Sequence, residues 1–137
     1  IDLAEQVNKG MPSYTVGRVA DLLNERRLPV AGSRILGVGI AYKPNIGDMR
    51  ESPALKVIEL LRNAGSEVAY HDRHVPSLPA LELESAELDP RAYDCVAIVT
   101  DHSGVDYDRV VAEAHLVVDF RNATGETGRS SDKVWKL

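Results

Sequence analysis

The stretch that decides the fold is Arg34–Ala64, RILGVGIAYKPNIGDMRESPALKVIELLRNA, in a chain of 137 residues. It begins with an uncharged apolar run at 35–40, which predicts a short strand covered on both faces. Ser52 can accept a hydrogen bond from first-turn amides, and Pro53 suits the first position of a helix. Apolar residues then recur at helical spacing until Gly65, which favours a helix end. The stretch therefore predicts a strand, a polar loop and a helix.

The loop at 41–51 is the part of this stretch that points to chemistry. It lies at the carboxyl end of the predicted strand, where open α/β sheets bind their ligands, and the positive end of the next helix faces the same region. Lys43 offers a mobile point charge, and Arg50 a planar guanidinium suited to phosphate. We interpret the loop as an anion site. The alternative from the residues alone is a solvated Lys43 and an Arg50 that pairs with Asp48 or Glu51.

The rest of the chain continues the alternation of strands with helices or loops. Apolar runs predict strands at 67–72, 94–100 and 115–120 and a short helix at 107–114. One helix connects the first two strands, so we expect these strands to be parallel and their connection to be right-handed. The fold class we predict is α/β, an open, mostly parallel, Rossmann-like three-layer sandwich with an N-terminal helix.

Three segments have less regular patterns. At the N-terminus, a helical segment at 1–9 is broken or bent by Gly10-Met11-Pro12-Ser13, and a second amphipathic helix follows up to residue 25. Pro, Leu and Glu residues at 74–91 predict an irregular excursion with one helical turn before Pro90. Gly, Ser and Thr residues at 121–133 predict a flexible loop, after which 134–137 forms a final edge strand or ends the chain.

The carboxyl ends of three predicted strands should meet at one edge of the sheet. The polar segments that follow them are 42–50, 100–102 and 120–121, and their convergence indicates a binding site. Arg121 leaves an apolar strand directly into a Gly-rich loop, so it is a candidate ligand residue. The alternative is a surface arginine that pairs with Asp119.

Composition narrows the class of protein. The length is that of one domain, and 44% hydrophobic and 27% charged residues are typical of a globular one. A net charge of −5 does not favour nucleic acid or an anionic membrane as partner, and no apolar run is long enough to span a bilayer. One cysteine excludes an internal disulfide and fits a reducing cytoplasm. We expect a fragment of a longer protein, because the chain opens without Met inside a helix-like segment.

Other motifs give weaker signals. Gly37-x-Gly39 lies inside the predicted strand and lacks a third glycine, so the chain is not expected to hold NAD by itself. His71-Asp72-x-His74 has metal-capable side chains, but neighbours in a strand point to opposite faces, so we predict no metal site. The sequence at 101–103, Asp-His-Ser, cannot form a catalytic triad with itself. Cys95, in an apolar strand, is interpreted as a buried small hydrophobe rather than a nucleophile.

The segment Gly39–Ala54 reads G-x-x-Y-K-P-x-x-x-D-x-R-E-S-P-A and resembles a known family signature. It is similar to the C-terminal, UDP-binding domain of the UDP-glucose/GDP-mannose dehydrogenase family. The similarity continues at 70–72, 100–102 and 118–122, so it covers most of the chain. The variants present look most like those of bacterial UDP-N-acetyl-hexosamine 6-dehydrogenases.

The resemblance implies an activity for the longer protein. Members oxidise the C6 hydroxyl of a nucleotide sugar to a carboxylate in two NAD-dependent steps, through a thiohemiacetal on a catalytic cysteine. That cysteine and the NAD-binding domain would precede this chain, and the fragment alone would be inactive. Residues 1–30 would be the end of an inter-domain helix that builds a homodimer, and 31–137 the UDP-binding domain.

The resemblance also assigns roles to site residues. Tyr42 and Lys43 correspond to the pair that contacts the UDP-sugar, and Arg121 to an arginine that reaches the same ligand. Arg50 corresponds to an arginine that reaches NAD on the other domain. The alternative is a flavodoxin-like signalling or assembly module. Asp101 stands roughly where a receiver has its phospho-acceptor, but Tyr42-Lys43 replaces the acidic cluster that a receiver needs.

Overall fold

The computed structural model describes residues 3–41 and 52–137, with side chains from residue 12 onwards. Its helices are α1 (Leu3–Glu25), α2 (Pro53–Asn63), α3 (Tyr107–Glu113) and α4 (Gly125–Arg129), with 3-10 turns η1 (Pro79–Leu81) and η2 (Pro90–Ala92). Its strands are β1 (Arg34–Val38), β2 (Glu67–His71), β3 (Ser77–Leu78), β4 (Leu83–Glu84), β5 (Cys95–Ile98), β6 (Val117–Asp119) and β7 (Val134–Lys136).

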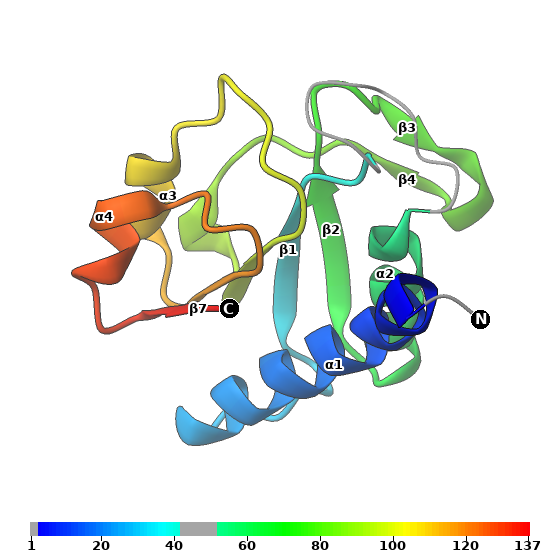
Figure 1. The fold of residues 1–137 in the computed structure, drawn as a ribbon, viewed down its shortest axis with the longest axis horizontal. Coiled ribbons are helices and arrows are strands. Elements are labelled where there is room, and N and C mark those ends of the chain that lie inside the picture. The colour runs from blue at the N-terminus through cyan, green and yellow to red at the C-terminus, as the bar shows by residue number, and fades with distance from the viewer. Residues whose placement is uncertain (1–2, 42–51) are drawn as a thin grey trace.

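A five-stranded parallel sheet in the order β2-β1-β5-β6-β7 forms the middle layer. Helices α1 and α2 pack together on one face, and α3 and α4 lie on the other (Figure 1). Successive residues of a strand point to opposite faces, so Ile35 joins the core under α1 and α2, and Leu36 joins the core under α3. The predicted open, mostly parallel α/β sandwich is confirmed.

Strand β1 lies in the middle of the fold because its residues are apolar. Ile35, Leu36 and Val38 are fully buried, with strands on both sides and helices on both faces. Burial of each such side chain contributes roughly 1.5–3 kcal/mol to stability. The strand predicted from the apolar run at 35–40 is therefore β1, which lies inside the sheet between β2 and β5.

Helix α2 begins and ends where the sequence predicts. The Oγ of Ser52 accepts a hydrogen bond from the amide of Ala54 at 3.3 Å, and Pro53 occupies the first turn. The buried stripe consists of Ala54, Val57, Ile58 and Leu61. Gly65 follows the helix with a φ of +95°, a conformation that side-chain-bearing residues disfavour.

Helix α1 continues through Pro12 without a break, so of the two predicted alternatives, a break or a bend, the break is wrong. A proline removes one helical hydrogen bond and pushes against the preceding turn, which bends a helix rather than necessarily ending it. In Figure 1 the first turns, in dark blue, run in a different direction from the rest of α1. Val19 and Leu23 in the later turns are fully buried against the sheet. Among the described residues, no helix combines the length and hydrophobicity needed to cross a membrane.

The segment at 74–91 is more regular than predicted. Strands β3 and β4 form a small antiparallel hairpin, with Leu78 opposite Leu83. Turn η1 connects them and ends at Glu82, which has a φ of +55°. The one helical turn expected before Pro90 is η1, and a second 3-10 turn, η2, begins at Pro90 itself. Leu78 is buried in a cluster with Ile58 and Tyr70, so contact with the main fold orders the hairpin.

The segment at 121–133 contains a helix, α4, where the sequence predicted a flexible loop. Thr124, at its start, donates through its hydroxyl to Asp119 at 2.6 Å. A side chain at Gly128 would collide with Thr124, so this glycine permits close packing rather than flexibility. Strand β7 then pairs with β6 in parallel at the edge of the sheet, as one of the two predicted alternatives states.

Candidate functional site

The described ends of β1 and β5 meet at the carboxyl edge of the sheet, as predicted. The hydroxyl of Thr100, after β5, donates to the carbonyl of Ala41, after β1, at 2.7 Å. The amide of Phe120, after β6, donates to the carbonyl of Ile98 at 3.1 Å, which places Arg121 beside the β5 end. Segments that are distant in the sequence thus form one surface at this edge.

Gly39 allows the β1 end to approach β5 closely. Its φ is +86°, and an added Cβ would lie 2.5 Å from the carbonyl oxygen of Thr100. Gly39 therefore lets the end of β1 pack directly against the backbone of the β5 end.

The side chain of Asp119 determines the backbone conformation around Arg121. This buried carboxylate accepts hydrogen bonds from the amides of Arg121 at 3.0 Å, Ala123 at 3.1 Å and Thr124 at 2.9 Å. Asn122 adopts a φ of +58° within this turn, a conformation that asparagine tolerates better than most residues. The backbone of Arg121 is therefore held in place at the carboxyl edge.

The guanidinium of Arg121 is exposed and remains available to a ligand. Within the ranges 3–41 and 52–137, no carboxylate forms an ion pair with it. The alternative prediction, that Arg121 pairs with Asp119, is wrong, because Asp119 bonds to backbone amides and to Thr124 instead. The structure thus leaves one of the predicted anion-binding side chains free of a described counter-charge.

The other three predicted site residues lie outside the described residues. These are Tyr42 and Lys43, predicted to contact the nucleotide sugar, and Arg50, predicted to reach NAD. Tyr42 and Lys43 are the first two residues after Ala41, and Arg50 lies two residues before Ser52. Their roles stay predictions.

A buried pair of Asp72 and His102 is the main feature that the sequence analysis missed. The two residues are each 1% exposed, and His102 Nε2 lies 2.9 Å from Asp72 Oδ2. Burial alone would raise the pKa of Asp72, but hydrogen bonds from the amides of Ile40, Ala41 and His74 and from His102 outweigh it and lower this pKa. The sequence shows both residues within short family-like motifs, but nothing in it pairs positions 30 residues apart.

The remaining metal-capable residues near this pair have other partners. His71 Nδ1 lies 2.7 Å from the carbonyl oxygen of Ala86. The ring of His74 contacts that of His102, with centroids 4.6 Å apart and planes tilted by 47°. In the part of the chain that the structure describes, no three His, Cys, Asp or Glu residues are arranged to hold a metal ion.

Cys95 is fully buried in β5, as predicted, and burial raises the pKa of its thiol to about 12. We therefore expect the native protein to react with a thiol reagent at pH 8 at least about a hundredfold more slowly than the protein in urea, because the thiolate is the reactive form. The measurement is the release of chromophore from a disulfide reagent with and without denaturant. Equal rates in the two conditions would show that Cys95 is accessible.

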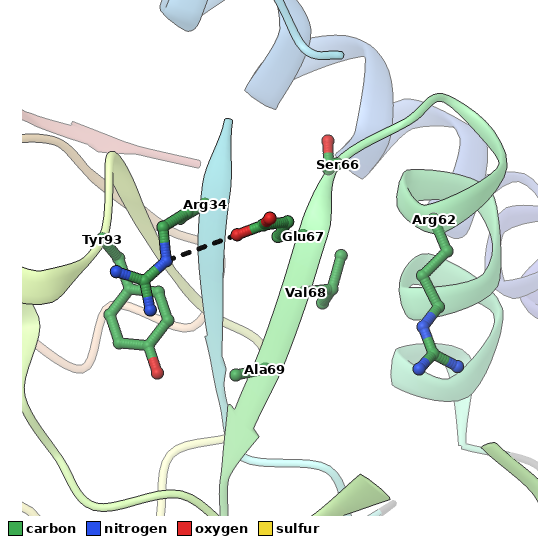
Figure 2. Close-up of a pocket in the computed structure, with 7 residues that line it drawn as sticks. All are labelled: Arg34, Arg62, Ser66, Glu67, Val68, Ala69 and Tyr93. Atoms are coloured by element: carbon green, nitrogen blue, oxygen red, sulfur yellow. Dashed lines mark ion pairs between the residues drawn. The ribbon is translucent and has the colours of Figure 1, made fainter. Parts of the chain in front are cut away.

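A shallow cavity of about 250 Å³ lies elsewhere, along the outer strand β2 near its amino end. Arg34 points toward Glu67, with 3.5 Å between Nε and Oε2, and its guanidinium lies over the ring of Tyr93 (Figure 2). Arg62, from α2, donates to the carbonyl of Leu81 at 2.9 Å. Both arginines already have partners, and the cavity is lined by residues from the amino ends of β1 and β2, so it is not the candidate site.

The parallel α/β fold with a cationic residue at its carboxyl edge defines the class, a ligand-binding domain of the Rossmann-like type. The model of the UDP-glucose/GDP-mannose dehydrogenase family, UDP binding domain, matches residues 36–126. The chain belongs to this family, and the resemblance noted in its sequence is confirmed. The match does not favour the alternative of a signalling or assembly module.

Known relatives agree with this assignment. A UDP-N-acetyl-D-mannosamine dehydrogenase of Pyrococcus horikoshii is 29% identical over 92% of this chain and 30% of its own. An NDP-N-acetyl-D-galactosaminuronic acid dehydrogenase of Ralstonia nicotianae is 31% identical over 88% of this chain and 29% of its own. The structure of another such dehydrogenase, from Methanosarcina mazei Go1, shows the same fold, with a TM-score of 0.83, 23% identity, and coverage of 98% and 30%. The chain spans about a third of the length of these relatives.

Proposed function

We propose that this domain binds the UDP part of a nucleotide sugar at the carboxyl edge of its sheet. The protein that contains it is proposed to be an NAD-dependent dehydrogenase that oxidises the sugar C6 hydroxyl to a carboxylate. The sugar of the substrate would resemble the N-acetyl-hexosamines named for the relatives in Pyrococcus and Ralstonia.

The observation that supports this proposal is the position of Arg121. Its backbone is fixed by Asp119, and its guanidinium is exposed without a counter-charge among the described residues. A planar guanidinium forms two parallel hydrogen bonds with a phosphate, which suits a diphosphate ligand. The chain as a whole carries a net charge of −5, so attraction of an anion requires such a local cation.

NAD is proposed to bind mainly to the part of the protein outside this chain. Gly37-x-Gly39 lacks the third glycine of a dinucleotide fingerprint, so the first strand here is not proposed to hold the pyrophosphate of NAD. NAD would supply the hydride acceptor, and Arg50 is proposed to reach it from this domain. We further propose a homodimer built through residues 1–30 and a cytoplasmic location, in line with the single buried cysteine.

We expect Arg121→Ala to weaken UDP binding by about 10- to 100-fold, because one charge-assisted contact with phosphate contributes about 1.5–3 kcal/mol. Titration calorimetry of the intact protein with UDP, GDP and UMP measures this effect. UDP should bind more tightly than UMP, since UMP lacks the second phosphate.

Arg91→Ala is the matched control, because Arg91 is also a surface arginine, with its side chain 72% exposed and paired with Glu113. It lies in η2, before the amino end of β5, so its removal should leave UDP affinity unchanged. Equal affinity of the wild type and Arg121→Ala would contradict the role of Arg121. Failure of the wild type to bind any of the three nucleotides would contradict the proposed function itself.

A further inference from the structure

The dipeptide Ile40-Ala41, which follows β1 after Gly39, is held by side chains rather than by the sheet. The amides of Ile40 and Ala41 donate to Asp72 Oδ2 at 2.7 and 3.0 Å. The hydroxyl of Ser52 donates to the carbonyl of Ile40 at 2.5 Å, and that of Thr100 to the carbonyl of Ala41 at 2.7 Å. All four backbone polar groups of the dipeptide therefore bond to side chains from three other segments.

Asp72 is the centre of this arrangement. Its Oδ1 accepts from the amide of His74 at 2.8 Å, and its Oδ2 accepts from His102 in addition to the two amides of the dipeptide. A carboxylate oxygen only accepts, so His102 Nε2 must carry the proton in this pair. Asp72, which follows β2, therefore connects His102, after β5, with the backbone after β1.

His102 is itself fixed on two sides. Its backbone amide donates to the hydroxyl of Tyr107 at 3.1 Å, and its ring contacts the tilted ring of His74. Apolar side chains of similar size would fill this space without the cost of removing a carboxylate from water. A buried, fully bonded polar pair at a ligand-binding edge is the kind of support that orients a site.

We propose that Asp72 and His102 are positioning residues for nucleotide binding. The hydrogen bond from His102 holds the Asp72 carboxylate against the Ile40 and Ala41 amides, and this fixes the backbone of these two residues at the carboxyl edge, where UDP is proposed to bind. The proposal rests on the proposed function, because it assigns a role in UDP binding at the same edge. Neither residue is expected to touch the ligand.

Two substitutions of His102 test the need for its N–H donor. His102→Gln places an amide donor near Asp72, whereas His102→Leu keeps bulk without a donor. In the intact protein, we expect His102→Leu to raise the Kd for UDP about tenfold or more and His102→Gln to change it by less than about threefold. Hydrogen exchange of the Ile40 and Ala41 amides without nucleotide should accelerate in His102→Leu and not in His102→Gln.

Leu116→Ala is the control for general loss of stability. Leu116 is buried directly before β6, at the opposite end of the sheet, so its loss should lower stability without affecting the Kd for UDP. Unchanged UDP affinity in His102→Leu would overturn the inference, as would equal weakening in His102→Gln. A wild type that does not bind UDP would overturn the proposed function and this inference together, so the two failures are distinguishable.

Discussion

Asp72→Asn is expected to lower the free energy of unfolding by about 3 kcal/mol at pH 7, since it breaks a buried network of charged hydrogen bonds. Oδ2 of Asp72 accepts three hydrogen bonds, and Oδ1 accepts one from the amide of His74. Whichever way an asparagine turns, its NH₂ group faces one of these donors. At least one buried amide or imidazole N–H then loses its acceptor.

The effect of Asp72→Asn should depend on pH in a defined direction. The pKa of Asp72 is lower in the folded protein than its ordinary value. The ionised carboxylate therefore stabilises the fold above the unfolded-state pKa of about 4, and this contribution is lost as the pH falls through the folded-state pKa. Urea unfolding at pH 7, 5, 4 and 3 measures the free energy of unfolding of the wild type and the variant. The difference between the two should be constant from pH 7 to 5 and should shrink as the pH falls below about 4.

Asp132→Asn is the control for loss of a negative charge, because Asp132 is exposed. It should change the free energy of unfolding by no more than about 0.5 kcal/mol. A difference between wild type and Asp72→Asn that is small at pH 7, or that grows as the pH falls, would contradict the network as described.

Gly39→Ala should destabilise the protein by about 3 kcal/mol or more, because backbone strain and steric overlap add at this position. The φ of Gly39 is +86°, which residues with a Cβ rarely adopt. The new Cβ would also lie 2.5 Å from the carbonyl oxygen and 2.9 Å from the amide nitrogen of Thr100. Both atoms belong to the backbone of β5's end, which cannot move without disturbing the sheet. Thermal and urea unfolding measure the loss.

Gly17→Ala makes the same chemical change in α1, where a Cβ meets nothing within 4 Å. Alanine favours a helix over glycine by about 1 kcal/mol, so this variant should be as stable as the wild type or more so. If Gly39→Ala matched Gly17→Ala in stability, the close approach of the β1 and β5 ends would be wrong.

The α2 region shows how much of the fold short-range patterns predict. Ser52, Pro53 and Gly65 mark the helix ends through their own backbone and side-chain chemistry, and the structure confirms each of them. The apolar runs likewise predict the strands β1, β2, β5 and β6 and the mostly parallel sheet that they form. These features depend on neighbours in the sequence, so the sequence alone reveals them.

The incorrect predictions concern segments whose structure depends on distant partners. Helix α4 forms where a flexible loop was predicted, and there Thr124 bonds to Asp119. The β3–β4 hairpin is ordered with Leu78 packed near Ile58 and Tyr70. Local composition suggested breaks and loops in each case, but tertiary contacts outweighed it.

The candidate site also combines features that the sequence predicts with features that only the fold reveals. Arg121 could be predicted from its place at a strand end, since the carboxyl ends of parallel strands meet at one edge. The freedom of its guanidinium could not, because it depends on Asp119 bonding to amides instead. The pairing of Asp72 with His102 was equally hidden, since it joins residues that only the fold brings together.

The sequence by itself determined the α/β class, the central β1 and α2 unit, and the resemblance that the family match over residues 36–126 confirms. Periodicity, helix capping and a long local motif are all short-range properties, so they are readable along the chain. Only the tertiary structure decided which polar groups support the carboxyl edge. Buried carboxylates must find hydrogen-bond donors somewhere in the fold. For Asp72, the amide of His74 is a neighbour in the sequence, but the amides of Ile40 and Ala41 and the ring of His102 are brought to it only by the fold.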